Sequence, residues 1–548
     1  MCGIAGSFGT ASASVFDAVF DGIKHRGLDG VGVFRHQRLA LGMHRLRFRG
    51  AEVALPVHHA DAVSAYNGQV YGQHAGSGYL TAVDGLDNEI ALAAHSPGAD
   101  GMYAYSRYAP RQGQLTLATD WHFIKPLFVR ELPDEIVFAS EMTALLRQGA
   151  PARIDQGALA ELFAYGWYLG DQTCAAGVSL VWKDDVAIDA HGLRRTPKRA
   201  QRPAPPAPPS IAALRQAIAA SVRRSAQGAG PLGLALSGGL DSSILACELN
   251  AQGVENLVCV TVRTEDGDDD LATLAQLGLP TPGAWQTWKH VVVPVGDQDF
   301  LAGFASATRA FGQPTTMSSL PLYQQLADAA AAHGVRAMLL GEGVDEYFGG
   351  YGSYAKVDDP ASVQAYYRNA ARRALVRCLF GDEASGAVEQ RFTQLYGDCP
   401  DLRAIETQMR LTRLLLRSDV CLMARSIEGR VPFLYNHIPD LALGLDWRAL
   451  TSGLGKTFLR QAYAAELGPR AQRPKVRFKS SDAMLLRCLA RDDMAQRIVR
   501  QCARLFDAGA VARALDRLRT AGGFDADVLC LLMSLTFLLE SELLDANP

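Results

Sequence analysis

The sequence predicts two domains: an α+β domain over residues 1–195 and an α/β domain over residues 211–548, whose core is a doubly wound parallel sheet with a helical C-terminal part. In the second half, short apolar runs alternate with helical patterns, as in parallel sheets crossed over by helices. In the first half, short strands follow one another with loops between them. Residues 196–210 are rich in proline and predict an extended linker.

The composition is that of a globular protein, because 48% of the 548 residues are hydrophobic and 20% are charged. A net charge of −3 gives no bulk attraction to nucleic acid or to a membrane surface. The ten cysteines show no C-x-x-C pair or clustered spacing, which argues against a disulfide framework and a structural zinc site. With no signal peptide and no long apolar run, we expect a cytoplasmic protein with no membrane or nucleic-acid partner.

Cys2 follows Met1, so removal of the methionine would leave a cysteine at the amino terminus. Such a residue carries a nucleophile and a base together, because its α-amine titrates near ~8 and its thiol near ~8.5. The plain alternative is a cysteine that is simply buried.

The first domain is expected to contain a helix over 14–23, a strand over 39–43, a strand–turn–strand over 66–71 and a strand over 135–139. The motifs H-R-G-L-D from residue 25, H-R-L from 44, Y-N-G-Q-V-Y from 66 and A-S-E-M from 139 lie on or beside these elements. Their order resembles the glutaminase domain of class II glutamine amidotransferases, in particular the asparagine synthetase branch. This resemblance implies an αββα N-terminal-nucleophile fold.

The resemblance also implies roles for individual residues. Cys2 would attack the side-chain amide of glutamine, while Asn67 and Gly68 would form the oxyanion hole. Arg45 would pair with the α-carboxylate of glutamine, and Asp87, in a looser match, would bind its α-amine.

Two positions depart from the family pattern. Leu28 stands where the family has proline, and Gln69 stands where it has glutamate. Neither change removes a catalytic group.

The second domain opens with a strand over 232–236, a tight turn and a helix. Two glycines let backbone N–H groups approach a ligand, and the helix start adds partial positive charge. No lysine follows, so this is not a Walker A loop; the S-G-G-x-D-S pattern resembles the pyrophosphate loop of ATP pyrophosphatases. An ordinary strand-to-helix turn is the alternative. The loop residues assigned to ATP and pyrophosphate are Ser237, Gly238, Gly239, Asp241, Ser242 and Ser243.

Further strands are expected over 257–262, 291–295 and 336–340, and the last leads into G-E-G-V-D-E-Y-F-G-G-Y from Gly341. Asp345 and Asp241 follow two strand ends, so both could face one pyrophosphate bound to Mg²⁺. Glu342 is placed to act as a base on an incoming amine.

The segment from Gly341 resembles G-E-G-S-D-E-V-F-G-G-Y of asparagine synthetases, and three later segments, beginning at residues 427, 455 and 473, also resemble that family. By this resemblance Lys475 would neutralise charge on the acyl-adenylate or its successor, and Val262 would lie where the backbone holds adenine.

The acceptor pocket is assigned to Met317, Glu342 and Tyr347. Met317 aligns with an arginine that engages substrate in asparagine synthetases, and a thioether cannot pair with a carboxylate. We therefore expect an acceptor other than plain aspartate. Residues 279–288 resemble an insertion that lines this pocket or covers the sheet edge.

The resemblance implies a ligase that uses ATP and Mg²⁺, adenylates a small carboxylic acid and forms an amide with ammonia from glutamine. Three alternatives stay open: asparagine synthetase itself, an intramolecular ligase of the β-lactam synthetase or lasso-peptide cyclase type, and a non-catalytic interaction protein. The sequence also leaves open an ammonia tunnel and a homodimer.

Overall fold

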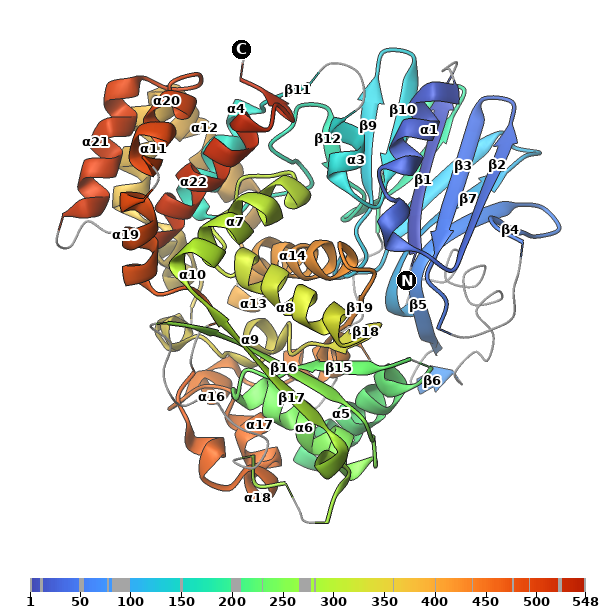
Figure 1. Cartoon of the computed structure of the whole chain (residues 1–548), viewed down its shortest axis with the longest axis vertical. Coiled ribbons are helices and arrows are strands. Elements are labelled where there is room, and N and C mark those ends of the chain that lie inside the picture. The colour runs from blue at the N-terminus through green and yellow to red at the C-terminus, as the bar shows by residue number, and fades with distance from the viewer. Residues whose placement is uncertain are drawn as a thin grey trace.

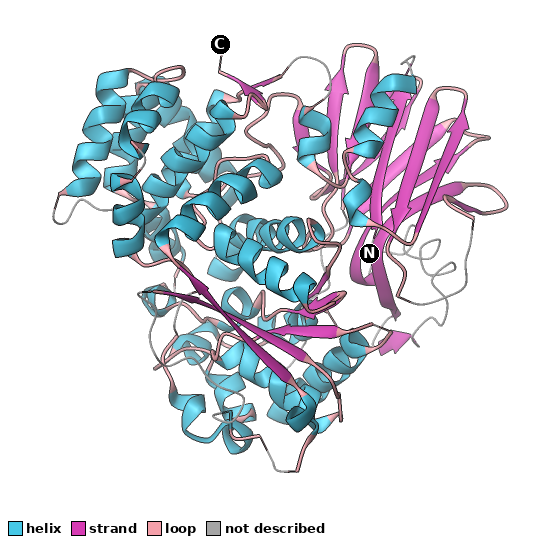
Figure 2. Cartoon of the chain, viewed as in Figure 1, coloured by secondary structure: helices cyan, strands magenta, loops and turns pink. Residues whose placement is uncertain are grey.

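The computed structural model shows the antiparallel strands of the N-terminal part gathered on one side of the molecule, and helices around a second group of strands on the other (Figures 1 and 2). None of the helices in the parts that it describes is long and apolar enough to cross a membrane. The described residues are 2–9, 13–48, 54–75, 78–80, 99–147, 151–198, 208–228, 230–265, 277–279, 282–357, 359–399, 401–435, 437–475, 478–491, 493–520 and 525–546.

The N-terminal part contains two antiparallel sheets. The first has the order β12-β9-β10-β1-β3-β2 and the second the order β14-β13-β8-β7-β5-β4, with β6 paired to β5. Helices α1 (Ala13–Asp21) and α3 (Met142–Leu146) pack on the first sheet, as Figure 1 shows. The strands are β1 (Cys2–Gly9), β2 (Gly30–His36), β3 (Leu39–Arg45), β4 (Val57–His58), β5 (Val63–Ala75), β6 (Gly78–Leu80), β7 (Ala99–Ala109), β8 (Gln114–Thr119), β9 (Phe128–Leu132), β10 (Glu135–Ala139), β12 (Val178–Leu180), β13 (Asp184–Asp189) and β14 (Gly192–Pro197).

An apolar core fills the space between the two sheets. Ile4 and Met43 from the first sheet pack in one cluster with Ala65 and Leu117 from the second. Cys2 belongs to the same cluster, so the predicted nucleophile lies at the edge of this sandwich core.

Two expectations for this part differ from the structure. Residues 66–71 form no turn but lie within the continuous strand β5, whose pairing with β7 shifts between Val70 and Gly72. The pair N-G suggests a turn, yet here Gly68 lets β5 pass close to the backbone of β7. Strand β14 continues to Pro197 and so includes the first two residues of the expected linker.

The second part is built on a five-stranded parallel sheet of order β17-β16-β15-β18-β19. Its strands are β15 (Leu232–Ala235), β16 (Val258–Thr264), β17 (Lys289–Val295), β18 (Ala337–Leu339) and β19 (Glu428–Arg430). The first four lie within two residues of the predicted strands. The sequence pattern missed β19, because three residues with two charged side chains carry no strand signal.

Helices cover both faces of this sheet, which confirms the doubly wound fold (Figure 1). The helices α5 (Ile211–Ala226) and α6 (Leu240–Ala251) lie on one face, and α8 (Leu320–Ala332) and α14 (Thr412–Met423) lie on the other. The remaining longer helices form the helical part: α4 (Gln156–Tyr165), α7 (Asp297–Phe311), α10 (Pro360–Tyr367), α11 (Ala370–Phe380), α12 (Asp382–Tyr396), α19 (Asp482–Ala490), α20 (Met494–Cys502), α21 (Ala508–Arg519) and α22 (Ala526–Glu540).

The two parts are joined by shared structure as well as by the linker. Helix α4 comes from the N-terminal part but packs among α11 and α12 (Figure 1). Strand β11 (Ala152–Arg153) pairs in parallel with β20 (Leu544–Asp545) near the chain end. This arrangement lets N-terminal residues reach the site of the second part.

Candidate active sites

Cys2 lies at the start of β1 and is 4% exposed. Its backbone N–H donates to Oδ1 of Asn67 at 3.1 Å, so β5 places the predicted oxyanion-hole residue beside the predicted nucleophile. Burial raises the pKa of the Cys2 thiol, although the amino terminus and Arg45 oppose this shift. The thiol therefore needs a base before it can act as a nucleophile.

The amide nitrogen of Asn67 is buried and has no hydrogen-bond partner among the described residues. A buried donor without a partner is costly, by about 1–3 kcal/mol, unless a ligand satisfies it. The Nδ2 group is thus available to an oxygen atom of a substrate bound at Cys2.

Gly68 follows with a φ of +116°, and a Cβ at this position would lie 2.0 Å from the carbonyl oxygen of Met102 on β7. Only glycine fits there, since any side chain would collide with backbone. Arg45 pairs with Cys2 across β1 and β3 and is buried, which places it in the same site. Asp87 lies outside the described residues.

The H-R-G and A-S-E motifs meet behind Cys2. His25 Nε2 and Arg26 Nη1 lie 2.9 Å and 2.8 Å from Oε1 of Glu141. Arg26 also donates from Nε to the Cys2 carbonyl at 3.4 Å, and Ser140 Oγ accepts from the Ile4 amide at 3.0 Å. These motifs therefore hold the strand that carries Cys2.

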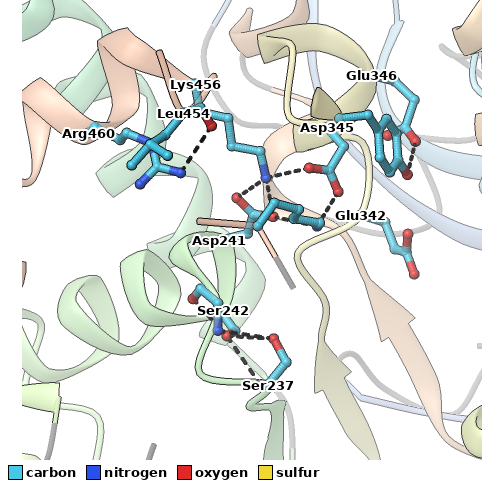
Figure 3. Close-up of polar contacts among 12 residues, drawn as sticks. Ser237, Asp241, Ser242, Glu342, Asp345, Glu346, Leu454, Lys456 and Arg460 are labelled. Carbon is cyan, nitrogen blue, oxygen red and sulfur yellow. Dashed lines mark hydrogen bonds and ion pairs between the residues drawn. The ribbon is translucent and has the colours of Figure 1, made fainter. Parts of the chain in front are cut away.

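In the second part, the turn after β15 is closed by serine hydroxyls, as Figure 3 shows. Ser237 Oγ lies 3.2 Å from Ser242 Oγ, and the Gly239 amide donates to Ser237 Oγ at 3.3 Å. Gly238 takes a positive φ of +73° in this turn. Ser243 is buried, and its Oγ has no hydrogen-bond partner among the described residues. The turn therefore has the small residues and free donors of an anion cradle.

Two carboxylates converge on one ammonium group at the carboxyl ends of β15 and β18 (Figure 3). Lys456 Nζ lies 2.6 Å from both carboxylate oxygens of Asp241 and 2.6 Å from Oδ1 of Asp345. Lys475 Nζ lies 2.5 Å from Oδ2 of Asp345 and 3.8 Å from Oδ2 of Asp241. Gly341 permits the approach, because a Cβ there would lie 2.9 Å from the Asp241 Cβ.

The charges in this cluster balance one another. Burial opposes ionisation of Asp345, but Lys456 and Lys475 outweigh it and hold the pKa of this carboxyl well below its usual range. Burial likewise opposes the charge on Lys475, but Asp345 and Asp241 raise its pKa. The two aspartates offer hard oxygen donors, the kind of ligand that suits Mg²⁺ completed by phosphate and water oxygens, and here they hold the ammonium group of Lys456.

A cavity of about 440 Å³ joins this cluster to the helical part. It is lined by several predicted residues: Ser237, Asp241, Ser242, Val262, Met317, Gly341, Glu342, Asp345 and Lys475. It therefore unites the expected phosphate, metal and acceptor residues in one space.

Glu342 is the centre of a hydrogen-bond network inside the cavity. Its Oε1 accepts from Arg417 at 2.5 Å, from Ser418 Oγ at 3.2 Å and from the hydroxyl of Tyr323. The Arg417 guanidinium also stacks 3.9 Å from the centre of the Tyr323 ring. These donors fix the carboxylate in place.

Tyr347 and residues 279–288 were both expected at the acceptor pocket. Tyr347 is not among the described residues that line the cavity, and its hydroxyl lies 2.9 Å from Nε2 of His122 in the N-terminal part; its place in the acceptor pocket stays a prediction. The described part of residues 279–288 also lies away from the cavity, since Trp288 donates to the Val254 carbonyl at 2.7 Å beyond the end of α6.

Sequence reasoning missed three contributors to the cavity or its charge balance. Lys456 lies in the G-K segment that resembles the family, but no pattern in the sequence showed which carboxylates it pairs with. Arg417 lies in no recognised motif. It provides a cation in the pocket where Met317 stands in place of the arginine of the family. Trp167 lines the cavity from the N-terminal part, which no local pattern could reveal.

The comparisons with known proteins agree with this geometry. A family model described as Asparagine synthase matches residues 213–540, and one described as Glutamine amidotransferase domain matches residues 1–196.

Individual relatives are distant. Asparagine synthetase B [glutamine-hydrolyzing] of Escherichia coli is 24% identical over 81% of this chain and 75% of its own length. Asparagine synthetase [glutamine-hydrolyzing] 2 of Oryza sativa is 23% identical over 86% and 74%. Asparagine synthetase [glutamine-hydrolyzing] 1 of Bacillus subtilis is 26% identical over 63% of this chain, which spans only 56% of that protein.

Among solved structures, a glutamine phosphoribosylpyrophosphate amidotransferase from B. subtilis aligns with 47% of this chain and 75% of its own at 15% identity. Its TM-score of 0.25 is too low to bear on the fold. The two family models, however, cover both parts of the chain. The chain therefore belongs to the asparagine synthase family, as an ATP-dependent ligase with its own glutamine amidotransferase domain.

Proposed function

We propose that the chain adenylates the carboxylate of a small acid other than plain aspartate and converts it to an amide with ammonia released from glutamine. The observation that carries the proposal is the convergence of Asp241 and Asp345, which line the cavity from two neighbouring strand ends, on the ammonium group of Lys456. In this proposal residues 1–195 supply the nitrogen and residues 211–548 carry out the ligation.

In the glutaminase half, Cys2 gives its thiol proton to the α-amine that removal of the initiator methionine would leave and attacks the side-chain amide carbon of glutamine. Ammonia leaves as the carbon–nitrogen bond breaks, and water then hydrolyses the thioester to glutamate. The oxygen that becomes negative is stabilised by Nδ2 of Asn67 and the amide of Gly68. The unsatisfied Nδ2 of Asn67 supports this role. Arg45 pairs with the α-carboxylate of glutamine, and Asp87 binds its α-amine.

In the synthetase half, the turn from Ser237 to Ser243 holds the pyrophosphate portion of ATP, with Val262 and Gly341 beside the nucleotide. Asp241 and Asp345 would hold Mg²⁺, which when bound offsets the negative charge of the phosphates. The acceptor carboxylate attacks the α-phosphorus and pyrophosphate leaves.

Ammonia then attacks the acyl carbon, and AMP leaves with the electron pair of the broken carbon–oxygen bond. Glu342 takes the proton from the attacking nitrogen. Its carboxylate lines the cavity and accepts a hydrogen bond from Arg417. Lys475 neutralises charge on the acyl-adenylate from the side of Asp345.

Met317 supports an acceptor other than plain aspartate, because this residue is 6% exposed and lines the cavity with no charge to offer. Glu342 in the cavity and Cys2 beside Asn67 favour asparagine synthetase itself as the second candidate.

The test is a reaction with ATP, Mg²⁺ and a panel of acids, with glutamine, with ammonium or with neither. We expect AMP, pyrophosphate and an amide with either nitrogen source, and none for the Cys2→Ala variant with glutamine alone. Aspartate as the best acceptor would favour asparagine synthetase. A product lighter than the acceptor by one water, formed without a nitrogen source, would establish intramolecular ligation and overturn the proposal.

A further inference from the structure

The cavity wall that faces the helical part is aromatic. Tyr165 and Trp167 reach it from the end of α4 and the turn that follows, and Tyr366 and Tyr367 reach it from the end of α10. Tyr351 lines the same cavity. Rings of this kind bury large areas of a planar apolar group at little cost in conformational entropy.

These rings are held in place by neighbours. The guanidinium of Arg410 lies 5.3 Å from the Trp167 ring and 4.9 Å from the Tyr351 ring. Tyr165 stacks on Phe392 with centroids 4.6 Å apart. The aromatic wall is therefore preformed and offers a fixed surface to a ligand.

The described lysines and arginines that line the cavity are already paired with carboxylates of the protein. A second carboxylate on the acceptor would have to compete with these internal partners or be buried without compensation, which is costly. The pairs are Arg372 with Asp525 at 2.9 Å and Asp527 at 2.6 Å, Arg410 with Glu406 at 2.5 Å, Arg417 with Glu342 at 2.5 Å, Lys475 with Asp345 at 2.5 Å and Lys479 with Asp482 at 3.3 Å.

We propose that the acceptor is an aromatic monocarboxylic acid whose ring lies against the wall of Trp167 and Tyr366, with its carboxylate directed towards the ATP site. This inference rests on the proposed function and adds the chemical class of the acceptor. Met317 fits it, because a thioether makes favourable contacts with aromatic rings. Selectivity against acidic amino acids then follows, because the arginines among the described lining residues are each paired with a carboxylate of the protein.

Acid-dependent exchange of labelled pyrophosphate into ATP tests the inference. The probes are 3-phenylpropanoate, its saturated analogue 3-cyclohexylpropanoate, aspartate and glutamate. We expect kcat/KM for 3-phenylpropanoate to exceed that for either amino acid by at least tenfold, and to exceed that for the saturated analogue.

Variants connect the preference to the wall. Trp167→Ala should lower kcat/KM for 3-phenylpropanoate by at least tenfold and leave KM for ATP unchanged, while Trp167→Phe should retain most of the activity. Trp121→Ala is the matched control, because Trp121 is 40% exposed and is not among the described lining residues. An unchanged glutaminase rate shows that each variant is folded.

The failures are distinguishable. Exchange that is robust with aspartate or glutamate and weak with 3-phenylpropanoate overturns the acceptor class but leaves the ligase intact. A Trp167→Ala variant with unchanged selectivity also overturns it. Exchange with none of the acids would contradict the inference and the proposed adenylation together.

Discussion

Arg26 and Asp419 are 393 residues apart in the sequence, yet Nη2 of the arginine lies 2.6 Å from Oδ2 of the aspartate. Both side chains are buried, and the pair joins the N-terminal part to helix α14. Arg26 also contacts the Cys2 carbonyl at 3.4 Å, and Ser418, next to Asp419, donates to Glu342. One ion pair thus links the structures that carry the two candidate sites.

Breaking this pair should disturb both stability and nitrogen transfer. Asp419→Ala leaves a buried guanidinium with one partner fewer, so we expect a loss of about 3–5 kcal/mol in the free energy of unfolding. Synthesis with glutamine should fall more than synthesis with ammonium. Denaturant unfolding and product assays measure these effects; Asp17→Ala is the control, because its pair with Arg35 is exposed and should contribute less than ~1 kcal/mol. Equal losses with both nitrogen sources would contradict the link.

Lys456→Met should make the stability of the protein depend on Mg²⁺. The variant leaves Asp241 and Asp345 facing each other with less positive charge between them, so repulsion should cost at least about 1 kcal/mol. Thermal unfolding should show a larger rise in Tm with millimolar Mg²⁺ than the wild type shows. Lys479→Met serves as the control, since that side chain is 42% exposed. A variant whose Tm does not rise with Mg²⁺ more than that of the wild type would argue against a metal site formed by the two aspartates.

Glu346 should make the protein less stable as pH rises. Burial and the neighbouring Asp345 raise the pKa of Glu346 from 4.5 to about 8. The folded state therefore keeps a proton that the unfolded state loses, and stability falls as pH increases through this window. Denaturant titrations between pH 5 and 8 should show a flatter dependence for Glu346→Gln. The same slope in both proteins would show that Glu346 titrates normally; Glu389→Gln, at a 43% exposed side chain, should leave the slope unchanged.

Met317→Arg should introduce exchange with aspartate. The substitution adds a guanidinium to the cavity wall, and a charge-assisted hydrogen bond is worth about 1.5–3 kcal/mol, or roughly 10–100-fold in kcat/KM. Met317→Leu controls for volume. If the arginine variant prefers the same acids as the wild type, Met317 does not determine the acceptor.

Local patterns were enough to predict the doubly wound sheet and the loops at its carboxyl edge. The strand before Ser237 and the strand before Gly341 are short apolar runs followed within two residues by glycine, and the fold brings their ends together. Gly68 shows the limit of such patterns: N-G predicts a turn, but the glycine is needed where β5 passes the Met102 carbonyl.

Contacts between distant segments could not be predicted in the same way. Nothing near Trp167 shows that α4 leaves its own domain to line a cavity of the other. Tyr347 follows Asp345 by two residues on a short helix, and its hydroxyl contacts His122 of the N-terminal part. The direction in which a helix presents each side chain sets this contact, and the motif carries no information about it.

The central claim is that nitrogen from glutamine reaches an adenylated carboxylate. The most direct measurement is mass analysis of products from glutamine labelled with ¹⁵N at the side-chain amide, together with assay of the nucleotide products. We expect ¹⁵N in the amide of the acceptor, with AMP and pyrophosphate formed in equal amounts; Cys2→Ala should make the unlabelled amide from added ammonium only. ADP and phosphate as nucleotide products, or an amide without ¹⁵N, would contradict the claim.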